Sequence, residues 1–95
     1  PLEIDGFTSG LDEIHLDDKC FKNLGLGTDD GTALKKGMFV ANYTGLATKK
    51  FAQIVYEKDT GELYYDADGK GGKEAIHFAT LTDQADLFLS DFFII

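Results

Sequence analysis

Three short runs of β-branched and aromatic residues, separated by turn sequences, occupy the C-terminal half of the chain. The runs span 54–56, 63–65 and 75–81, and residues of these types fit the pleated, half-buried surface of a β-sheet. Residues 58–61 form the first turn sequence, and its glycine can supply the positive φ that a tight hairpin requires. The spacing therefore predicts a β-meander within residues 38–81.

The N-terminal half carries shorter signals. Residues 14–16 alternate apolar and polar side chains, as a half-buried strand does. Residues 17–19 can begin a helical turn, because acidic side chains are favourable at the positive end of a helix dipole. Cys20, Phe21 and Leu24 would then form its buried face, and we interpret the only cysteine as a small buried hydrophobe. These signals predict one mainly-β domain with one or two short helical turns.

The chain is strongly acidic, with 17 acidic against 9 basic residues and a formal net charge of −8. This balance disfavours nucleic acid as a partner, because nucleic-acid-binding proteins present a basic face. It equally disfavours anionic membrane surfaces, and no apolar run reaches the roughly 18–20 residues of a membrane span. The charge favours cations, and its self-repulsion should destabilise the compact state until a cation or salt relieves it.

Asp66 and Asp68 lie in an acidic, glycine-rich turn between the second and third β-rich runs. Calcium takes about six to eight oxygen ligands, often from alternate residues of a glycine-bent loop. The turn is not an EF-hand, because Lys70 and His77 would occupy two ligand positions of that motif. Two interpretations stay open: a partial calcium site completed by other loops, or a hairpin turn whose carboxylates cap backbone amides.

A second candidate metal ligand lies near the N-terminus. Gly10, Asp12 and Ile14 match the second half of the calcium-binding nonapeptide of β-rolls, G-G-x-G-x-D-x-U-x. In that motif Gly10 turns the chain, Asp12 binds the ion and Ile14 points into the roll. Asp12 would be a ligand of the last calcium site if complete repeats precede Pro1, and a polar turn residue if they do not.

The final five residues combine one acidic side chain with four apolar ones. They are Asp91, Phe92, Phe93, Ile94 and Ile95. Chain ends are usually frayed and polar, so this segment is interpreted either as a last strand or as a recognition tag for a transporter that engages the C-terminus first. The chain contains no nucleophile elbow, phosphate-binding glycine loop or metalloprotease helix motif, so we predict that it is not itself an enzyme.

Together these segments resemble the C-terminal domain of RTX-type (hemolysin-type) calcium-binding proteins, which bacteria export by type I secretion. Residues 4–16 are similar to the family's exit from its repeats, D-F-x-x-G-x-D-x-I-x-L, with Gly6 as an insertion. Residues 56–71 follow the pattern Y-D-x-x-T-G-x-L-x-Y-D-A-D-G-x-G, with Glu57 in place of the first aspartate. Residues 91–95 match the family's terminus, an Asp-Phe pair followed by apolar residues.

The resemblance implies a single non-catalytic C-terminal domain that caps a β-roll. Residues 1–16 would be the end of the roll, 38–81 the meander, and 91–95 the terminal strand and secretion signal. The implied partners are the ABC transporter complex of the type I secretion apparatus and the upstream RTX repeats of the same chain. Because the chain begins without methionine, we expect it to be a fragment of such a longer protein.

The resemblance also implies Ca²⁺ as a cofactor and an extracellular location. Calcium is scarce in the cytosol, so acidic loops would repel one another and keep the chain unfolded for export. Outside the cell, sites with dissociation constants of about 10⁻⁴–10⁻³ M would fill, and binding would drive folding.

Two other interpretations stay open. The chain could be an autonomous, adhesin-like binding module that uses an aromatic surface of Tyr43, Tyr56 and Tyr64. Alternatively, it could be the tail of a secreted protease or lipase whose active site lies upstream.

Overall fold

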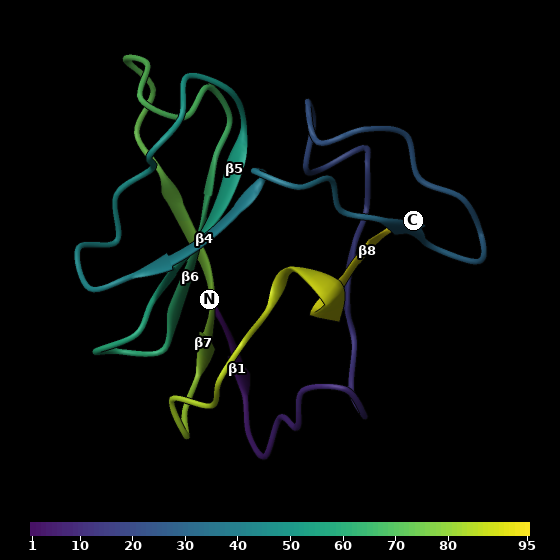
Figure 1. The fold of residues 1–95 in the computed structure, drawn as a ribbon, viewed down its shortest axis with the longest axis vertical. Coiled ribbons are helices and arrows are strands. Elements are labelled where there is room, and N and C mark those ends of the chain that lie inside the picture. Colours follow the sequence, from purple (N-terminus) through teal and green to yellow (C-terminus); the bar gives the residue numbers. More distant parts are fainter.

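The β-rich runs of the C-terminal half form an antiparallel meander, as predicted. In the computed structural model, which describes all residues 1–95, the meander consists of β5 (Gln53–Glu57), β6 (Glu62–Asp66) and β7 (Ile76–Leu81) (Figure 1). Gly61 closes the β5–β6 hairpin with φ of +78°, a conformation in which a side chain is disfavoured. The meander forms the centre of a five-stranded sheet.

Both edges of this larger sheet are parallel additions. β1 (Leu2–Ile4) pairs with β7, and β4 (Phe39–Asn42) pairs with β5. β4 is therefore not part of the meander predicted for residues 38–81, because a parallel neighbour needs a crossover connection and not a hairpin. That connection, residues 43–52, packs on the outer face of the sheet, where Gly45 adjoins the side chains of Glu57 and Tyr64. Val55, on the same face, is fully buried.

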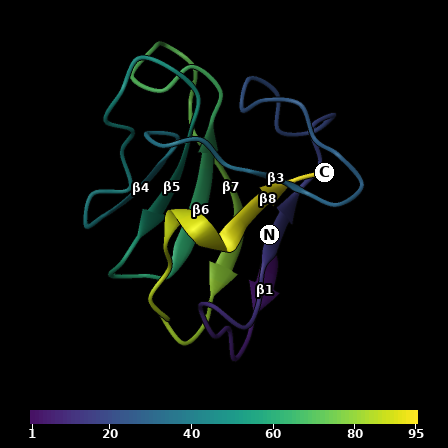
Figure 2. The same ribbon diagram turned by 45° about the vertical axis from the view of Figure 1, so that its right-hand side comes forward.

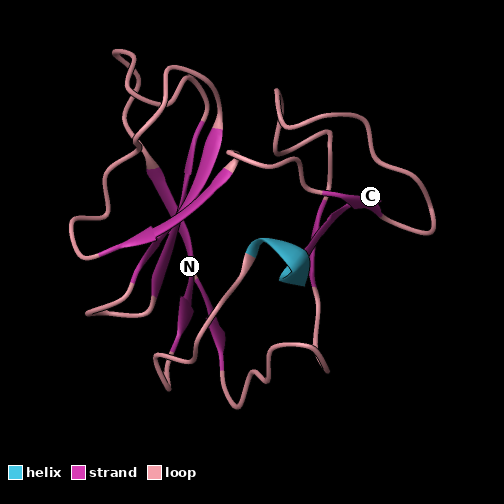
Figure 3. Cartoon of the chain, in the orientation of Figure 1, coloured by secondary structure: helices cyan, strands magenta, loops and turns pink.

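A second, three-stranded sheet has the C-terminal strand at its centre. β8 (Phe92–Ile94) pairs in parallel with β2 (Ile14–Leu16) and antiparallel with β3 (Thr32–Ala33). Figure 2 shows β8 running alongside β3. A single 3₁₀ turn, η1 (Leu89–Asp91), leads into β8 and is the only helix in Figure 3. The structure thus confirms a mainly-β fold with a short helical turn.

The hydrophobic core lies between the two sheets. The larger sheet contributes alternate residues of its three central strands, namely Ile54, Tyr56, Leu63, Tyr65, Ala79 and Leu81. The smaller sheet and its loops contribute Ile14, Leu16, Leu24, Leu34, Phe92 and Ile94. No helix of the structure has the length and hydropathy of a membrane-spanning helix.

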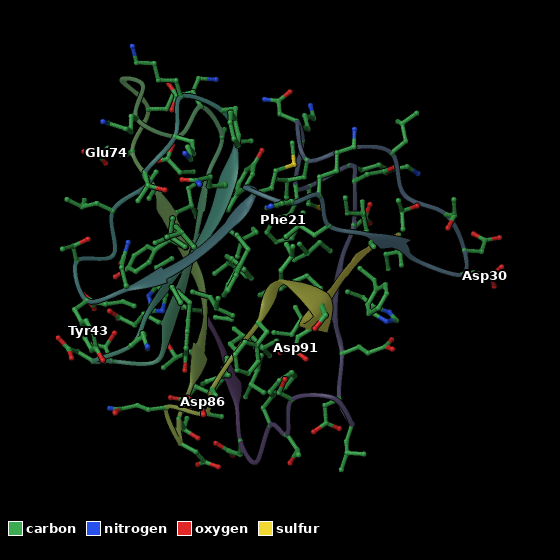
Figure 4. All side chains as sticks on the ribbon, in the orientation of Figure 1. Phe21, Asp30, Tyr43, Glu74, Asp86 and Asp91 are labelled. Atoms are coloured by element: carbon green, nitrogen blue, oxygen red, sulfur yellow. The ribbon has the colours of Figure 1, made fainter.

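The segment after β2 differs from its prediction. The amides of Cys20 and Phe21 donate to the carbonyl of Asp17 at 3.0 and 2.8 Å, which closes one turn and no more. Cys20 is exposed, so its interpretation as a buried hydrophobe is wrong. Leu24 is fully buried instead, and Phe21, labelled in Figure 4, packs edge-on against the ring of Tyr65. A single turn is too short to present one continuous buried face. Only the side chains that point inward where the chain leaves the turn are therefore buried.

Candidate functional site

Residues 91–95 form part of the folded core. Asp91, Phe92 and Ile94 are buried, Phe93 is half-buried, and only Ile95 is exposed. The amide of Ile95 donates to the carbonyl of Leu16 at 2.8 Å, which extends the pairing with β2 to the last residue. In the folded state the segment is therefore a central strand, and its residues Phe92 and Ile94 are not available to a partner.

Asp91 is the residue of this segment whose side chain accepts hydrogen bonds. The Ser9 hydroxyl donates to its Oδ1 and Oδ2 at 2.9 and 2.8 Å, and the Gly10 amide donates to Oδ1 at 3.2 Å. The Phe88 amide donates to Oδ2 at 2.8 Å, across η1. Figure 4 labels Asp91 at η1, of which it is the last residue. Asp91 is 2 % exposed, so a buried residue near the C-terminus is hydrogen-bonded to a turn near the N-terminus.

Asp12 lies in that same N-terminal turn but is exposed. Its Oδ2 accepts a hydrogen bond from the Thr8 amide at 2.8 Å, and its own amide donates to the Thr8 carbonyl at 2.8 Å. Ile14, two residues on, is buried in the core, as the nonapeptide pattern requires. Asp12 does not form a common metal site with Asp66 and Asp68. No group of three or more acidic, histidine or cysteine side chains is placed to hold a metal ion.

Asp66 and Asp68 form the second candidate site, at the end of β6. Asp66 stands opposite Gln53 of β5 and is 6 % exposed. Oδ1 of Asp66 and Oδ1 of Asp68 are both buried and have no hydrogen-bond partner. The Lys73 amide donates a hydrogen bond to Oδ2 of Asp68 at 3.2 Å. Burial raises the pKa of Asp66, and the neighbouring Asp68 carboxyl raises that pKa further.

Gln53 fixes the loop that covers this carboxylate pair. Its Oε1 accepts hydrogen bonds from the amides of Thr48 and Lys49 at 2.7 and 3.3 Å, and its Nε2 donates to the Gly37 carbonyl at 2.8 Å. Sequence reasoning did not select Gln53 as a site residue. A polar side chain between Ala52 and Ile54, in a run that is otherwise apolar, is the signal that marks it.

The acidic turn, residues 66–72, contacts the loop of residues 43–52 directly at Gly69. The Lys70 amide donates to the Lys49 carbonyl at 2.8 Å. Gly69 has φ of +64°, and a Cβ built on it would lie 2.1 Å from the Lys49 carbonyl oxygen and 2.2 Å from that of Phe51. Glycine is therefore required here, and it brings the turn and the loop into contact.

Replacing Gly69 by alanine should lower the free energy of unfolding by about 2 kcal/mol, because the methyl group meets two backbone oxygens in a disfavoured backbone conformation. Gly72, in the same turn, is the matched control, since its Cβ would meet nothing within 4 Å. Urea unfolding followed by circular dichroism measures both changes. Equal stabilities of the two alanine variants would contradict the described contact.

An open cleft of about 460 Å³ lies beside the carboxylate pair. Gly45, Leu46 and Ala47 border it from the loop, and Asp66, Gly69 and Glu74 border it from the turn. Figure 4 places Glu74 at this end of the larger sheet. Water can therefore reach the edge of the site, although the Oδ1 atoms themselves are buried.

The three tyrosines proposed as an aromatic binding surface do not share one. Tyr56 is 2 % exposed and its hydroxyl donates to the Ala85 carbonyl at 2.6 Å within the core. Tyr64 pairs with Val55 and therefore faces the opposite side of the sheet from Tyr56. Tyr43 is exposed beyond the end of β4 (Figure 4). The alternation of side chains along β5 and β6 separates them.

Comparison with protein-family models, with curated proteins and with solved structures finds no match to this chain.

Proposed function

We propose that this domain is a non-catalytic C-terminal module of an exported, calcium-dependent RTX-type protein. It would cap the end of a β-roll and carry the type I secretion signal in residues 91–95. The observation that carries the proposal is the hydrogen bonding of the buried Asp91 side chain to Ser9 and Gly10. These residues belong to the segment that resembles the exit from RTX repeats. Hydrogen bonds therefore connect the segment that resembles the secretion signal to the segment that resembles the end of the β-roll.

The position of the N-terminal strands supports the capping role. β1 is an edge strand of the larger sheet and β2 an edge strand of the smaller one. Unpaired strand edges favour pairing with further strands. Upstream RTX repeats of the same chain, continuing from residues 1–16, are the partner that we propose for this side of the domain.

The burial of β8 supports an order of events for export. A transporter can engage residues 91–95 only while β8 is separated from β2 and β3, since Phe92 and Ile94 are buried in the folded domain. We propose that the ABC transporter complex engages the unfolded chain where calcium is scarce. Folding outside the cell then buries the same segment. A tail of a secreted protease or lipase would use the domain in the same way, with its activity upstream.

Export of an upstream reporter protein fused to this domain, in a bacterium with a type I apparatus, tests the proposal. Deleting residues 91–95 should abolish export, because the signal is lost. Leu63→Ala is the control, since Leu63 is fully buried in β6 and its truncation costs about 2–5 kcal/mol of stability without altering the signal. Leu63→Ala should export like the wild type. Unimpaired export of the deletion would refute the signal, and equal loss in both variants would show that export responds to folding alone.

A further inference from the structure

β4 is an edge strand of the larger sheet, and its outer edge is open. The carbonyls of Met38 and Asn42 accept hydrogen bonds at 2.8 Å from amides of β5 and of the residue after it. In a parallel pair, alternate residues of a strand bond to its neighbour, so the even-numbered residues of β4 bond to β5. The amides and carbonyls of Phe39 and Ala41 therefore point away from β5, toward the open edge.

β4 lacks the features that protect most edge strands from pairing. Native edges are blunted by charged residues, proline or β-bulges. The four residues of β4, FVAN, include no charge and no proline, and their register with β5 is regular. β1, the opposite edge of the sheet, carries Glu3 at its centre. β4 is therefore the edge that is better suited to accept a further strand.

An apolar groove of about 470 Å³ lies beside this edge, on the inner face of the sheet. Phe39, Ala41 and Tyr43 line it from the side of β4, and Leu87 and Phe88 line it from the segment that leads into η1. The rings of Tyr43 and Phe88 are 63 % and 55 % exposed. Folding of the domain thus leaves two large rings of the groove uncovered.

A strand added to β4 would direct alternate side chains toward this groove. Residues that stand opposite each other on paired strands project from the same face of the sheet. The two residues opposite Phe39 and Ala41 would therefore lie on the inner face, and the residue between them on the outer face. Ala41 is small, so it leaves room for a large side chain opposite it. In this mode of recognition, main-chain hydrogen bonds give affinity and the groove selects the side chains.

The end of the groove next to the β5–β6 hairpin is acidic. Asp59, Asp83 and Asp86 are exposed there, and the hydrogen bond from the Gln84 side chain to the Asp59 carbonyl holds the two segments together. Figure 4 labels Asp86 and Tyr43, which both line the groove. The basic residue of the lining, Lys58, lies over the Tyr43 ring, 5.3 Å from its centroid. With a net charge of −8 on the domain, this end attracts a basic group.

The other end of β4 has the opposite charge. Lys35 and Lys36 are exposed just before the strand. An antiparallel partner would run from the acidic end of the groove toward these lysines, so its amino end would lie among the aspartates and its carboxyl end near the lysines. The charges therefore favour antiparallel pairing, which is also slightly more stable than parallel pairing.

We propose that the open edge of β4 and its groove bind an extended, basic peptide segment of another protein. The segment pairs antiparallel with Phe39 and Ala41, places two alternate apolar side chains in the groove, and directs basic residues at its amino end toward Asp83 and Asp86. A second copy of this chain is a poorer occupant, because two domains that each carry a net charge of −8 repel each other. The site goes beyond the proposed function and does not rest on it, since β4 is at the opposite edge from β1.

The test is a titration of the isotope-labelled full chain with pooled synthetic peptides Arg-Lys-X-Thr-X-Thr-X-Thr, in which X is Val, Ile, Leu, Phe or Tyr. Binding should shift the amide resonances of Phe39 and Ala41 and slow the hydrogen exchange of both amides. A pool with Glu-Glu in place of Arg-Lys is the matched control, and we expect it to bind at least about fivefold more weakly.

Ala41→Pro tests the strand pairing. Proline is tolerated on an edge strand where the amide faces solvent, but here it removes a donor and puts its ring in the path of an added strand. Affinity for the basic pool should fall about tenfold or more. Glu3→Pro is the matched control on β1, where the Glu3 amide also faces away from the sheet, and it should bind like the wild type. Melting temperatures show whether both variants fold.

Two further variants test the groove without a proline. Phe88→Ala should weaken binding about fivefold, because an apolar wall is lost. Asp86→Asn should weaken it about twofold to fivefold and reduce its dependence on salt. Leu46→Ala is the control, since Leu46 is 67 % exposed in the loop on the outer face, and it should have no effect.

The outcomes that would overturn the proposal are distinct. No resonance shift with the basic pool at about 1 mM, or wild-type affinity in both Ala41→Pro and Phe88→Ala, would overturn the peptide site. Equal affinity for the two pools would overturn the assignment of a basic partner. Analytical ultracentrifugation should find a monomer, and a dimer that Ala41→Pro dissociates would assign the edge to a second copy instead. The export assay changes neither β4 nor the groove wall at Phe88, so the secretion proposal and this site fail independently.

Discussion

Replacing Phe92 by alanine should lower the free energy of unfolding by about 3–5 kcal/mol, the range for truncating a fully buried phenylalanine. Phe92 is 0 % exposed, pairs with Ile14 in β2, and its ring centroid lies 5.0 Å from that of Phe39. It therefore contacts both sheets at once. Domains of this size are stable by only about 5–15 kcal/mol, so the variant should unfold at a much lower urea concentration.

Phe93 is the matched control for this prediction. It is the next residue of the same strand, so it points to the opposite side of β8, and it is only half-buried. Phe93→Ala should cost about 1 kcal/mol, in proportion to the apolar surface that it covers. Equal losses in the two variants would contradict the position of β8 between the two sheets.

The difference between these neighbours could not be predicted from the sequence. The final segment reads as a strand because it is short, apolar and β-prone, but its partners are residues 14–16 and 32–33. Parallel pairing of β2 with β8 joins segments almost 80 residues apart, and no turn sequence between them predicts this pairing. The β5–β6–β7 meander was predictable for the opposite reason: turn sequences join its strands directly, and each turn specifies the next pairing.

The candidate sites also combine local features that the sequence predicts with long-range contacts that it does not. The spacing of Asp66 and Asp68 with the glycines that follow identified the acidic turn, and local hydrogen bonds at Asp12 are those of a turn. The burial of Asp66 was not predictable, because it depends on residues 43–52 crossing the outer face of the sheet and on Gln53 holding them there. Tyr56 was misplaced on a surface because only the position of the second sheet determines which face of β5 is internal.

Asp91→Ala should be the second strongly destabilising substitution, with a loss of about 3–5 kcal/mol. Removing the buried carboxylate leaves the Ser9 hydroxyl and the Gly10 and Phe88 amides, which are only partly buried, without their acceptor. Each hydrogen bond to a charged group contributes about 1.5–3 kcal/mol, and water replaces part of this loss because Ser9 is half-buried and Gly10 and Phe88 are exposed. Urea unfolding at neutral pH measures the loss.

Two comparisons make this prediction specific to the hydrogen bonds of Asp91. Asp12→Ala, in the exposed turn, removes one carboxylate with a single amide partner and should cost less than about 1 kcal/mol. Ser9→Ala combined with Asp91→Ala should show a coupling energy of about 0.5–3 kcal/mol, because the two side chains contact each other directly. Additive losses, or an Asp91→Ala loss no larger than that of Asp12→Ala, would mean that Asp91 does not join the ends of the chain. The C-terminal strand would then be held by its apolar side chains alone.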